Sequence, residues 1–465
     1  MLYGVGPAFE AGGAMICKAK AVQAKTELQW SVQKREQRSD FMRNTPGELM
    51  ETSPKIEKIA FVGNYLPRKC GIATFTSDLL SAVTERYPQT QCFAVPVNDV
   101  EEGYDYPRVV GFEIEEQNLS SYLRAADFIN ISNVDLVCLQ HEFGIFGGPA
   151  GSHLLALLWE LETPVVTTLH TVLREPNFEQ RRVMEELIAR STRLVVMTQR
   201  AKQMLQEVYQ APPGKIDFIP HGIPDMPLAN PNSYKDQFGV EGKVVLLTFG
   251  LLSPNKGIEQ VLNALPQILV EFPDVVYVVM GATHPHELQE RGEAYRLSLE
   301  ILAKKNKVEK NVIFYNRFVE LEELKEFIGA ADLYITPYLN EAQITSGALA
   351  YAFGAGKAVV STPYWHAAEL LAEDRGILVP FGDSGAIARE VAGLLRDSTR
   401  RHALGENAYK LGREMIWHNV ARLYMSAFEQ ARLKDAWLSP KLLVTKALDQ
   451  QQRVAQGYVS NSAAA

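Results

Sequence analysis

The chain has 465 residues, a net charge of −8 and a pI near 5.7, with 46% hydrophobic and 22% charged residues. This length is too great for one hydrophobic core, and the composition is ordinary for a globular protein, so we expect two domains. The acidic balance argues against a nucleic-acid partner and against general binding to anionic membranes, although peripheral membrane contact stays open.

The sequence shows none of the segments that direct a protein into or across a membrane. No apolar run is long enough to span a bilayer, and the first residues have no apolar signal core. The four cysteines have neither a CxxC pair nor a histidine at metal-ligand spacing. We therefore expect a cytoplasmic protein with reduced thiols.

The first 55 residues differ from the rest of the chain, because Gln, Lys, Arg and Glu are frequent there and strand signals are few. We expect residues 1–55 to form a loosely ordered extension. From Ile56, short apolar runs alternate with amphipathic stretches, which predicts a parallel sheet covered by helices on both faces. The strand-like runs are Lys58–Gly63, Gln91–Val97, Leu136–Gln140, Val165–His170, Leu194–Thr198 and Ile216–Ile219.

A Pro- and Asn-rich linker, Pro224–Asn232, separates this series from a second one of the same kind. The second series has strand-like runs at Val244–Phe249, Val275–Met280, Val312–Tyr315, Leu333–Thr336, Ala358–Ser361 and Ile377–Val379. A long helical stretch, Asn407–Ala436, is expected to close the second domain, and a frayed tail to follow it. The predicted fold class is α/β, with two Rossmann-like doubly wound domains that face a cleft. We expect the domains at residues 56–224 and 225–415, the closing helix at 416–438 and the tail at 439–465.

The most informative segment is Tyr338–Tyr364, in which a strand end, a polar loop, a helix of small residues and a second strand follow one another. A helix that begins with small residues presents unpaired N–H groups and a partial positive charge, which suit a phosphate. Thr345, Ser346 and Gly347 would supply those N–H groups. Glu341 stands just ahead of them, where a carboxylate can bind sugar hydroxyls. Together these features predict a site for a sugar that carries a diphosphate.

A second loop with ligand-binding character follows the strand that ends at Phe249. It contains Gly250, Lys256 and Gly257, and it lies at the carboxyl end of a parallel strand, where open α/β sheets bind ligands. Lys256 would be a point charge for a diphosphate. The alternative is a solvated lysine in a turn, but the combination with the Glu341 segment favours the phosphate.

Loops of the first domain offer candidates for the other side of the cleft. His170 ends an apolar strand, where it can hydrogen-bond a substrate hydroxyl or steer a proton, and the alternative is a core histidine. Gly71 and Ile72 begin a helix after a loop that carries Arg68 and Lys69, two cations that could meet an acidic group on a substrate. The alternative for this loop is an ordinary strand–helix turn.

Three further residues stand at loops or helix ends. Glu142 lies in a Gly-rich loop at a strand end, and His221 lies in the loop that enters the linker. Each is as consistent with a structural role as with a place in the cleft. Glu369 follows a proline on a short predicted helix, where its carboxylate can touch a ligand or cap a helix.

The common catalytic motifs are absent from the sequence. It contains no HExxH, GxSxG, Walker A, DxD or GxGxxG motif. Metal-assisted diphosphate chemistry and hydride transfer therefore lack sequence support. We expect no metal and no cofactor.

These motifs resemble those of the GT-B glycosyltransferases, and more narrowly those of the retaining family 4 group. The resemblance covers Lys58 to Ala436 and includes IPHGI at 219–223, FGLLSPNKGIEQVLNALP at 249–266, the Glu341 segment and RGILVPFGD at 375–383. It implies a hexosyltransferase that uses a nucleotide-diphospho-sugar donor of the GDP-mannose or UDP-glucose type. The implied acceptor is a carbohydrate or a lipid-linked molecule. Retention of the anomeric configuration, without a metal, is implied as well.

The resemblance assigns roles to the residues that match the family's motifs. Lys256 and Glu341 would act on the donor, and His170 would contact the transferred sugar. The chain departs from the family at Leu251, where an arginine is usual, and at Leu349, where a second glutamate usually binds the ribose. A non-catalytic module that binds a sugar or a partner therefore stays open, as does an epimerase or phosphorylase of the same fold.

Overall fold

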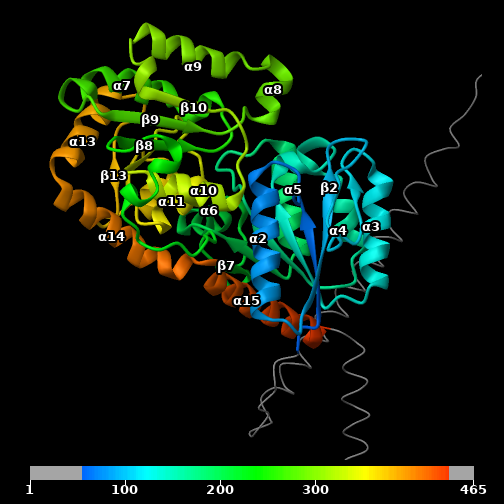
Figure 1. The fold of residues 1–465 in the computed structure, drawn as a ribbon. Helices are drawn as coiled ribbons and strands as arrows, with labels where there is room; N and C mark the ends of the chain where they lie inside the picture. Colours follow the sequence, from blue (N-terminus) through cyan, green and yellow to red (C-terminus); the bar gives the residue numbers. More distant parts are fainter. Residues whose placement is uncertain (1–54, 439–465) are drawn as a thin grey trace, which may run out of the picture. The chain divides into compact units, whose positions relative to one another are not determined.

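The computed structural model describes residues 55–438, which belong to one compact unit, Pro54–Ala465. Apart from Lys55, the predicted extension 1–55 lies outside the described residues, and so does the predicted tail 439–465. Within the described part, both predicted parallel sheets are present, each with helices around it (Figure 1).

The first sheet, within the described residues, has the strand order β3-β2-β1-β4-β5-β6-β7, and its neighbouring strands all pair in parallel. The strand order reverses direction between β1 and β4, which is where doubly wound sheets bind ligands. The strands are β1 (Lys58–Gly63), β2 (Gln91–Asn98), β3 (Ile114–Glu115), β4 (Leu136–His141), β5 (Val165–Leu169), β6 (Arg193–Val196) and β7 (Ile216–Phe218). The connecting α-helices are α2 (Gly71–Arg86), α3 (Leu119–Ile131), α4 (Leu154–Glu160), α5 (Phe178–Arg190) and α6 (Gln199–Tyr209).

The second sheet follows the same plan, with the order β10-β9-β8-β11-β12-β13 and parallel pairing of neighbours. Its strand order reverses between β8 and β11. The strands are β8 (Val244–Phe249), β9 (Val275–Met280), β10 (Val312–Tyr315), β11 (Leu333–Thr336), β12 (Ala358–Ser361) and β13 (Ile377–Leu378). Its α-helices are α7 (Ile258–Glu271), α8 (Pro285–Arg291), α9 (Ala294–Lys305), α10 (Leu321–Ala330), α11 (Gly347–Gly354), α12 (Trp365–Leu370), α13 (Ser384–Arg396) and α14 (Ser398–Met415).

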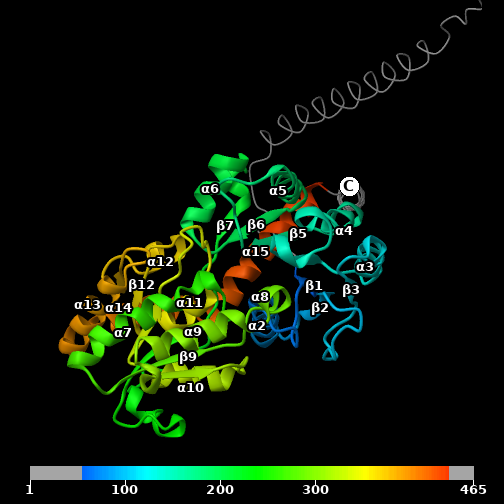
Figure 2. The same ribbon diagram turned by 90° about the horizontal axis from the view of Figure 1, so that it is seen from above.

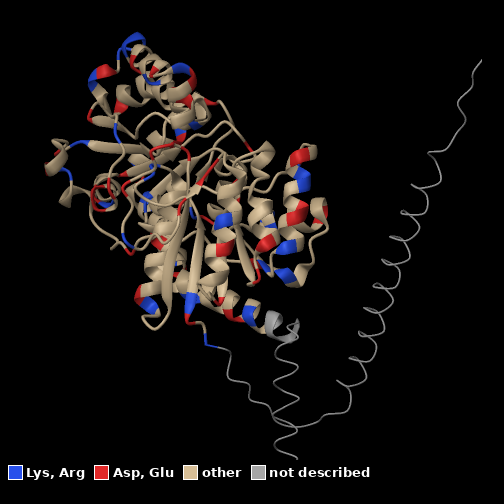
Figure 3. Ribbon diagram, turned by 90° about the vertical axis from the view of Figure 1, so that its right-hand side faces the viewer, with Lys and Arg blue, Asp and Glu red and all other residues tan. Residues whose placement is uncertain are grey.

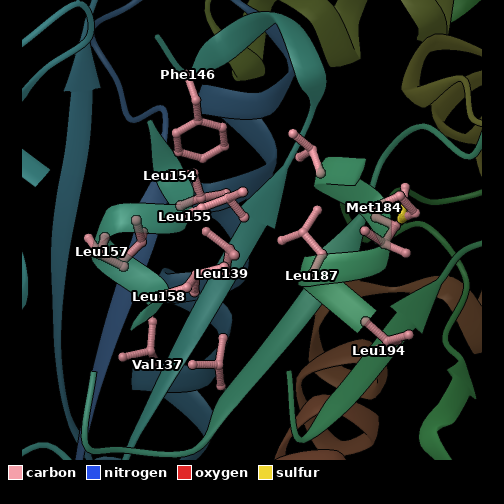
Figure 4. Close-up of a cluster of buried hydrophobic side chains, with 14 of the residues drawn as sticks. Val137, Leu139, Phe146, Leu154, Leu155, Leu157, Leu158, Met184, Leu187 and Leu194 are labelled. Atoms are coloured by element: carbon pink, nitrogen blue, oxygen red, sulfur yellow. The ribbon is translucent and has the colours of Figure 1, made fainter. Parts of the chain in front are cut away.

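The central strands are mostly apolar, because helices bury both faces of each sheet. In β4, Val137 and Leu139 face one helical layer, and the alternating residues Leu136 and Cys138 face the other. Figure 4 shows Val137 and Leu139 packed with side chains of α4 and α5. A continuous apolar run such as LVCL is therefore what a central parallel strand requires.

The last described helix, α15 (Trp417–Leu438), has nearly the bounds expected for the closing helix, 416–438, but it packs on the first sheet and not on the second domain. The longer helical stretch expected over Asn407–Ala436 is interrupted, and α14 and α15 are separate helices. The two meet at Ile416, which pairs with Ile223, just before the linker, in an isolated bridge. The chain thus returns to the first sheet, where α15 lies beside α2 (Figures 1 and 2). The apolar spacing of α15 explains this position, since its buried residues Val420, Tyr424, Phe428 and Ala431 recur on one face.

We call the first sheet with α2–α6 and α15 the first lobe, and the second sheet with α7–α14 the second lobe. Figure 3 shows basic and acidic residues mixed over the outer helices, while the strands carry few of either kind. Among the described residues, no helix combines the length and the apolar content of a membrane span.

Candidate active site

A large cleft opens between the two lobes at the carboxyl ends of their strands. Its volume is about 1870 Å³, and its lining comes from both lobes. The first lobe contributes the loops after β1, β2, β4 and β5, and the second lobe contributes those after β8, β9, β10 and β11. Both strand-order reversals therefore face the same space, as expected for a ligand site in open α/β sheets.

Most of the residues singled out in the sequence lie on this cleft. They share a position at the start of a loop or helix that follows a strand, and they are Gly71, Ile72, Glu142, His170, His221, Gly250, Lys256, Thr345, Ser346 and Gly347. Two predicted donor residues, Glu341 and Glu369, are not part of the lining. The structure thus brings the predicted Lys256 loop and helix start together with His170, and leaves both acids outside.

Glu341 is exposed, and its backbone carbonyl accepts a hydrogen bond from the N–H of Trp365 at 3.0 Å. Leu349, eight residues later, is fully buried in the second-lobe core. The residues of this segment that face the cleft with the same spacing of eight are Gln343 and Tyr351. The loop before α11 has no regular structure, so the sequence alone does not reveal which of its side chains face the cleft.

Glu369 of the second lobe caps the N-terminus of α6 in the first lobe. Its carboxylate accepts hydrogen bonds from the backbone N–H groups of Gln199 at 2.8 Å and Arg200 at 3.2 Å, at the start of α6. A negative charge there satisfies unpaired N–H groups and complements the helix dipole. The capping alternative considered for Glu369 thus describes its position in the structure.

The Lys256 loop is shaped by two glycines. Gly250 has φ +123°, and a side chain added to it would come within 3.6 Å of the Lys256 ammonium. Gly257 has φ +62°, and a Cβ there would lie 2.1 Å from the Pro337 carbonyl, so any other residue would be strained. The loop is held close to the end of β11, where the Lys256 ammonium donates to the Tyr338 hydroxyl at 2.6 Å.

The start of α11 forms the adjoining part of the cleft wall. Ser346 is the N-cap, and its hydroxyl accepts from the N–H of Leu349 at 3.3 Å. The N–H of Ser346 itself donates to Nδ1 of His366 at 2.8 Å, so it is not available to a ligand. The N–H groups of Gly347 and Ala348 lie in the first turn, where an α-helix offers no acceptor of its own.

Two neutral histidines stand opposite this helix start. His170 Nε2 lies 2.9 Å from Oε1 of Gln140, which assigns the ring proton to Nε2. His221 Nδ1 donates to the Gly222 carbonyl at 2.7 Å, and a Cβ on Gly347 would lie 2.9 Å from its other ring nitrogen. Burial lowers the pKa of His170 to about 3 and that of His221 to about 4, so both are uncharged at neutral pH.

Two of the first-lobe carboxyl groups that line the cleft, Glu142 and Asp78, have raised pKa values. Burial raises the pKa of Glu142, which accepts hydrogen bonds from the Thr171 hydroxyl and from the N–H of Phe143. Burial raises the pKa of Asp78 to about 6, although its hydrogen bond from the Tyr351 hydroxyl at 2.8 Å works in the opposite direction. Sequence reasoning missed Asp78, because it lies mid-helix in α2 and no local motif marks it.

Replacing Asp78 by asparagine is expected to stabilise the protein at neutral pH. The folded chain holds the Asp78 proton up to about pH 6, against an ordinary pKa of 3.8, so its stability falls as pH rises through that window. Asparagine carries no charge, so it avoids the loss of stability that ionisation of Asp78 causes, and its amide oxygen can still accept the hydrogen bond from Tyr351. We expect a gain of about 2 to 3 kcal/mol at pH 7.5 that disappears near pH 4, measured by urea unfolding. Asp274→Asn, at an exposed ion pair with Lys243, is the control and should change little.

A gain of equal size at both pH values would show that the Asp78 carboxyl does not titrate as described.

No cluster of three or more histidines, cysteines or acids within residues 55–438 is arranged to hold a metal ion.

The chain matches two known families over its two lobes. Residues 71–225 match Glycosyltransferase Family 4, and residues 232–411 match Glycosyl transferases group 1. Together these ranges take in well over half of the sequence.

Two named proteins are similar to the chain over part of its length. The chain is 27% identical to a phosphatidyl-myo-inositol mannosyltransferase of Mycolicibacterium smegmatis over 217 residues, which is 45% of this chain and 51% of that protein. It is 27% identical to a D-inositol 3-phosphate glycosyltransferase of Corynebacterium glutamicum over 60% of this chain and 69% of that protein. The chain thus spans about half the length of the first relative and somewhat more than two thirds of the second.

Solved structures share the fold at lower identity. HepE of Anabaena, in complex with UDP, superposes with a TM-score of 0.63 at 16% identity, covering 79% of this chain and 98% of HepE. Sucrose-phosphate synthase of Thermosynechococcus elongatus gives a TM-score of 0.64 at 15% identity, covering 80% of this chain and 98% of that protein. The family matches and the shared fold show that this chain belongs to the group 1 glycosyl transferases and has their two-lobed GT-B fold.

Proposed function

We propose that this protein transfers a hexose from a nucleotide-diphospho-sugar to a carbohydrate or lipid-linked acceptor. One observation carries the proposal: the Lys256 ammonium and the start of α11 share a cleft with His170 and Glu142 of the opposite lobe. A cation next to free helix N–H groups suits a diphosphate. The uncharged imidazole of His170 and the carboxyl group of Glu142, on the opposite lobe, suit sugar hydroxyls.

The relatives support this substrate class. HepE is described in complex with UDP, and also with UDP-glucose, and the named relatives act on inositol-containing acceptors. By analogy, the donor nucleotide would lie on the second lobe and the acceptor would enter from the first. GDP-mannose and UDP-glucose are the two donor types that we propose.

The chemistry that this site would perform is a substitution at the anomeric carbon. The bond from that carbon to the diphosphate oxygen breaks, and a bond to the acceptor hydroxyl oxygen forms. Negative charge grows on the leaving diphosphate, where Lys256 and the N–H groups of Gly347 and Ala348 would stabilise it without a metal. If the acceptor proton passes to the leaving oxygen on the same face of the sugar, the configuration is retained.

In this proposal Gln343 takes the role of sugar contact that the sequence suggested for Glu341. Gln343 lies on the cleft just before the helix start, and its side-chain amide donates to the Thr345 carbonyl at 2.7 Å. Its amide oxygen is therefore available to a sugar hydroxyl. His170 would approach the same sugar from the first lobe.

A screen of nucleotide-sugars tests the proposal. The protein is incubated with UDP-, GDP- and ADP-sugars, and the slow hydrolysis products are identified by mass spectrometry, which reports the base and the sugar together. We expect one nucleoside diphosphate and one hexose to accumulate above the level without enzyme. Turnover of no donor, together with no calorimetric binding of UDP, GDP or ADP, would instead support a non-catalytic module.

A further inference from the structure

We propose that Tyr338 is a positioning residue for diphosphate binding, which holds Lys256 in place where the family's usual arginine is missing. The inference rests on the proposed function, since it concerns the same donor site. It names a side chain that no sequence motif marks.

The Lys256 ammonium lies 2.6 Å from the Tyr338 hydroxyl oxygen and 4.1 Å from the centre of its ring. A lysine ammonium can only donate, so the phenol oxygen accepts this hydrogen bond. The phenol oxygen also lies 3.5 Å from the Ser346 hydroxyl, and either group can donate in this contact. Ser346 is the N-cap of α11, so one chain of polar groups joins the cation to the helix start.

The side chain of Tyr338 is held in a fixed position by its surroundings. Its side chain is 2% exposed, and its ring stacks on that of Tyr364 with centres 4.8 Å apart and planes 15° apart. Its backbone carbonyl accepts from the Thr362 hydroxyl at 2.6 Å. Because lysine has a long flexible stem, a fixed acceptor reduces the conformational entropy that Lys256 loses when a ligand binds.

The electrostatics of the pair agree with this geometry. Burial alone would raise the pKa of the Tyr338 phenol, but the adjacent Lys256 charge and the hydrogen bonds bring it below its ordinary value of 10. The phenol oxygen is therefore strongly polarised toward the ammonium.

The charges around the site explain why Lys256 needs this support. Leu251 occupies the loop position where the resemblance leads one to expect an arginine, so the loop offers no second charged group there. On the second lobe, the other cation that lines the cleft, Arg317, is already paired with Glu323. On the first lobe, Arg68 is paired with Asp99 at 3.0 Å, and Lys69 also lines the cleft. The placement of the Lys256 ammonium therefore decides much of the charge that a diphosphate meets on the second lobe.

Tyr338→Phe tests the proposal, because it keeps the stacked ring and removes the hydroxyl. Affinities for UDP, GDP and ADP, and for the matching nucleosides, are measured by calorimetry with the full chain. We expect about tenfold weaker binding of the nucleoside diphosphate and unchanged binding of the nucleoside. In turnover, the KM for the donor should rise while the KM for the acceptor stays the same.

Tyr364→Phe is the matched control. It removes a buried hydroxyl from the same stack, but that hydroxyl contacts Thr336 at 3.2 Å and not Lys256. A thermal melt compares the two variants. Tyr364→Phe should lower the melting temperature without weakening diphosphate binding.

A double variant separates an action of Tyr338 through Lys256 from a direct effect of Tyr338 on the ligand. If Tyr338 acts through Lys256, the double variant Lys256→Met/Tyr338→Phe should bind the diphosphate as weakly as Lys256→Met alone. Further loss in the double variant, or wild-type affinity in Tyr338→Phe when Lys256→Met binds weakly, would overturn the inference and leave the proposed function standing. Absence of diphosphate binding in the wild-type protein would overturn both.

Discussion

Replacing Lys256 by methionine is expected to lower kcat/KM for glycosyl transfer by about two to three orders of magnitude. The ammonium lines the cleft beside the start of α11, and its hydrogen bond to Tyr338 fixes where the charge lies. Charge grows on the diphosphate as the glycosidic bond breaks, so the lost interaction is stronger in the transition state than in the ground state. Steady-state rates with the donor found in the screen would measure the effect.

Lys243→Met is the control for this experiment. Lys243 is also a lysine of the second lobe, but it lies on the surface in an ion pair with Asp274 at 2.7 Å. We expect its rates to equal those of the wild type. If Lys256→Met folds normally and turns over at a near-normal rate, the cleft does not bind the diphosphate through this residue.

Replacing Phe428 by alanine should lower the free energy of unfolding by about 3 to 5 kcal/mol. Phe428 is fully buried in the cluster that α15 forms with α2 and the first sheet. The change removes a large aromatic side chain from a densely packed site, which cannot collapse fully around the cavity. Urea unfolding at pH 7.5 would measure the loss.

Ile131→Ala provides the comparison, because Ile131 ends a first-lobe helix and is 79% exposed. It should change stability by less than about 0.5 kcal/mol. Equal effects of the two substitutions would mean that α15 does not belong to the first-lobe core in solution.

The sequence was a good guide to the regular structure. All strand-like runs correspond to strands of the two sheets, because continuous apolar runs between amphipathic stretches are typical of buried parallel strands. It missed β3, since Ile114–Glu115 is a two-residue edge strand without a periodic pattern. It also joined α14 to α15, because both are helical and the break at Ile416 depends on a contact with Ile223.

The candidate site was predicted to a similar extent. Glycine loops at strand ends placed Lys256, Gly347 and His170 on the cleft, because strand ends of a parallel sheet meet at one edge. Glu341 was predicted from its place just ahead of α11, but the loop between them leaves its side chain exposed and outside the cleft lining. Tyr338 could not be recognised as a partner of Lys256, because 82 residues separate the two in the chain and only the fold brings them together.

The chain passes between the lobes at Ile223 and again at Ile416, and these two passages lie side by side. They are joined by backbone hydrogen bonds from Ile223 to Met415 and from Trp417 to Ile223, both at 2.9 Å. A single strand between two rigid bodies can twist as well as bend, whereas two strands bonded together strongly resist twisting. We therefore expect the lobes to move mainly by bending about one axis through this pair, so that the walls of the cleft approach and separate without twisting past each other.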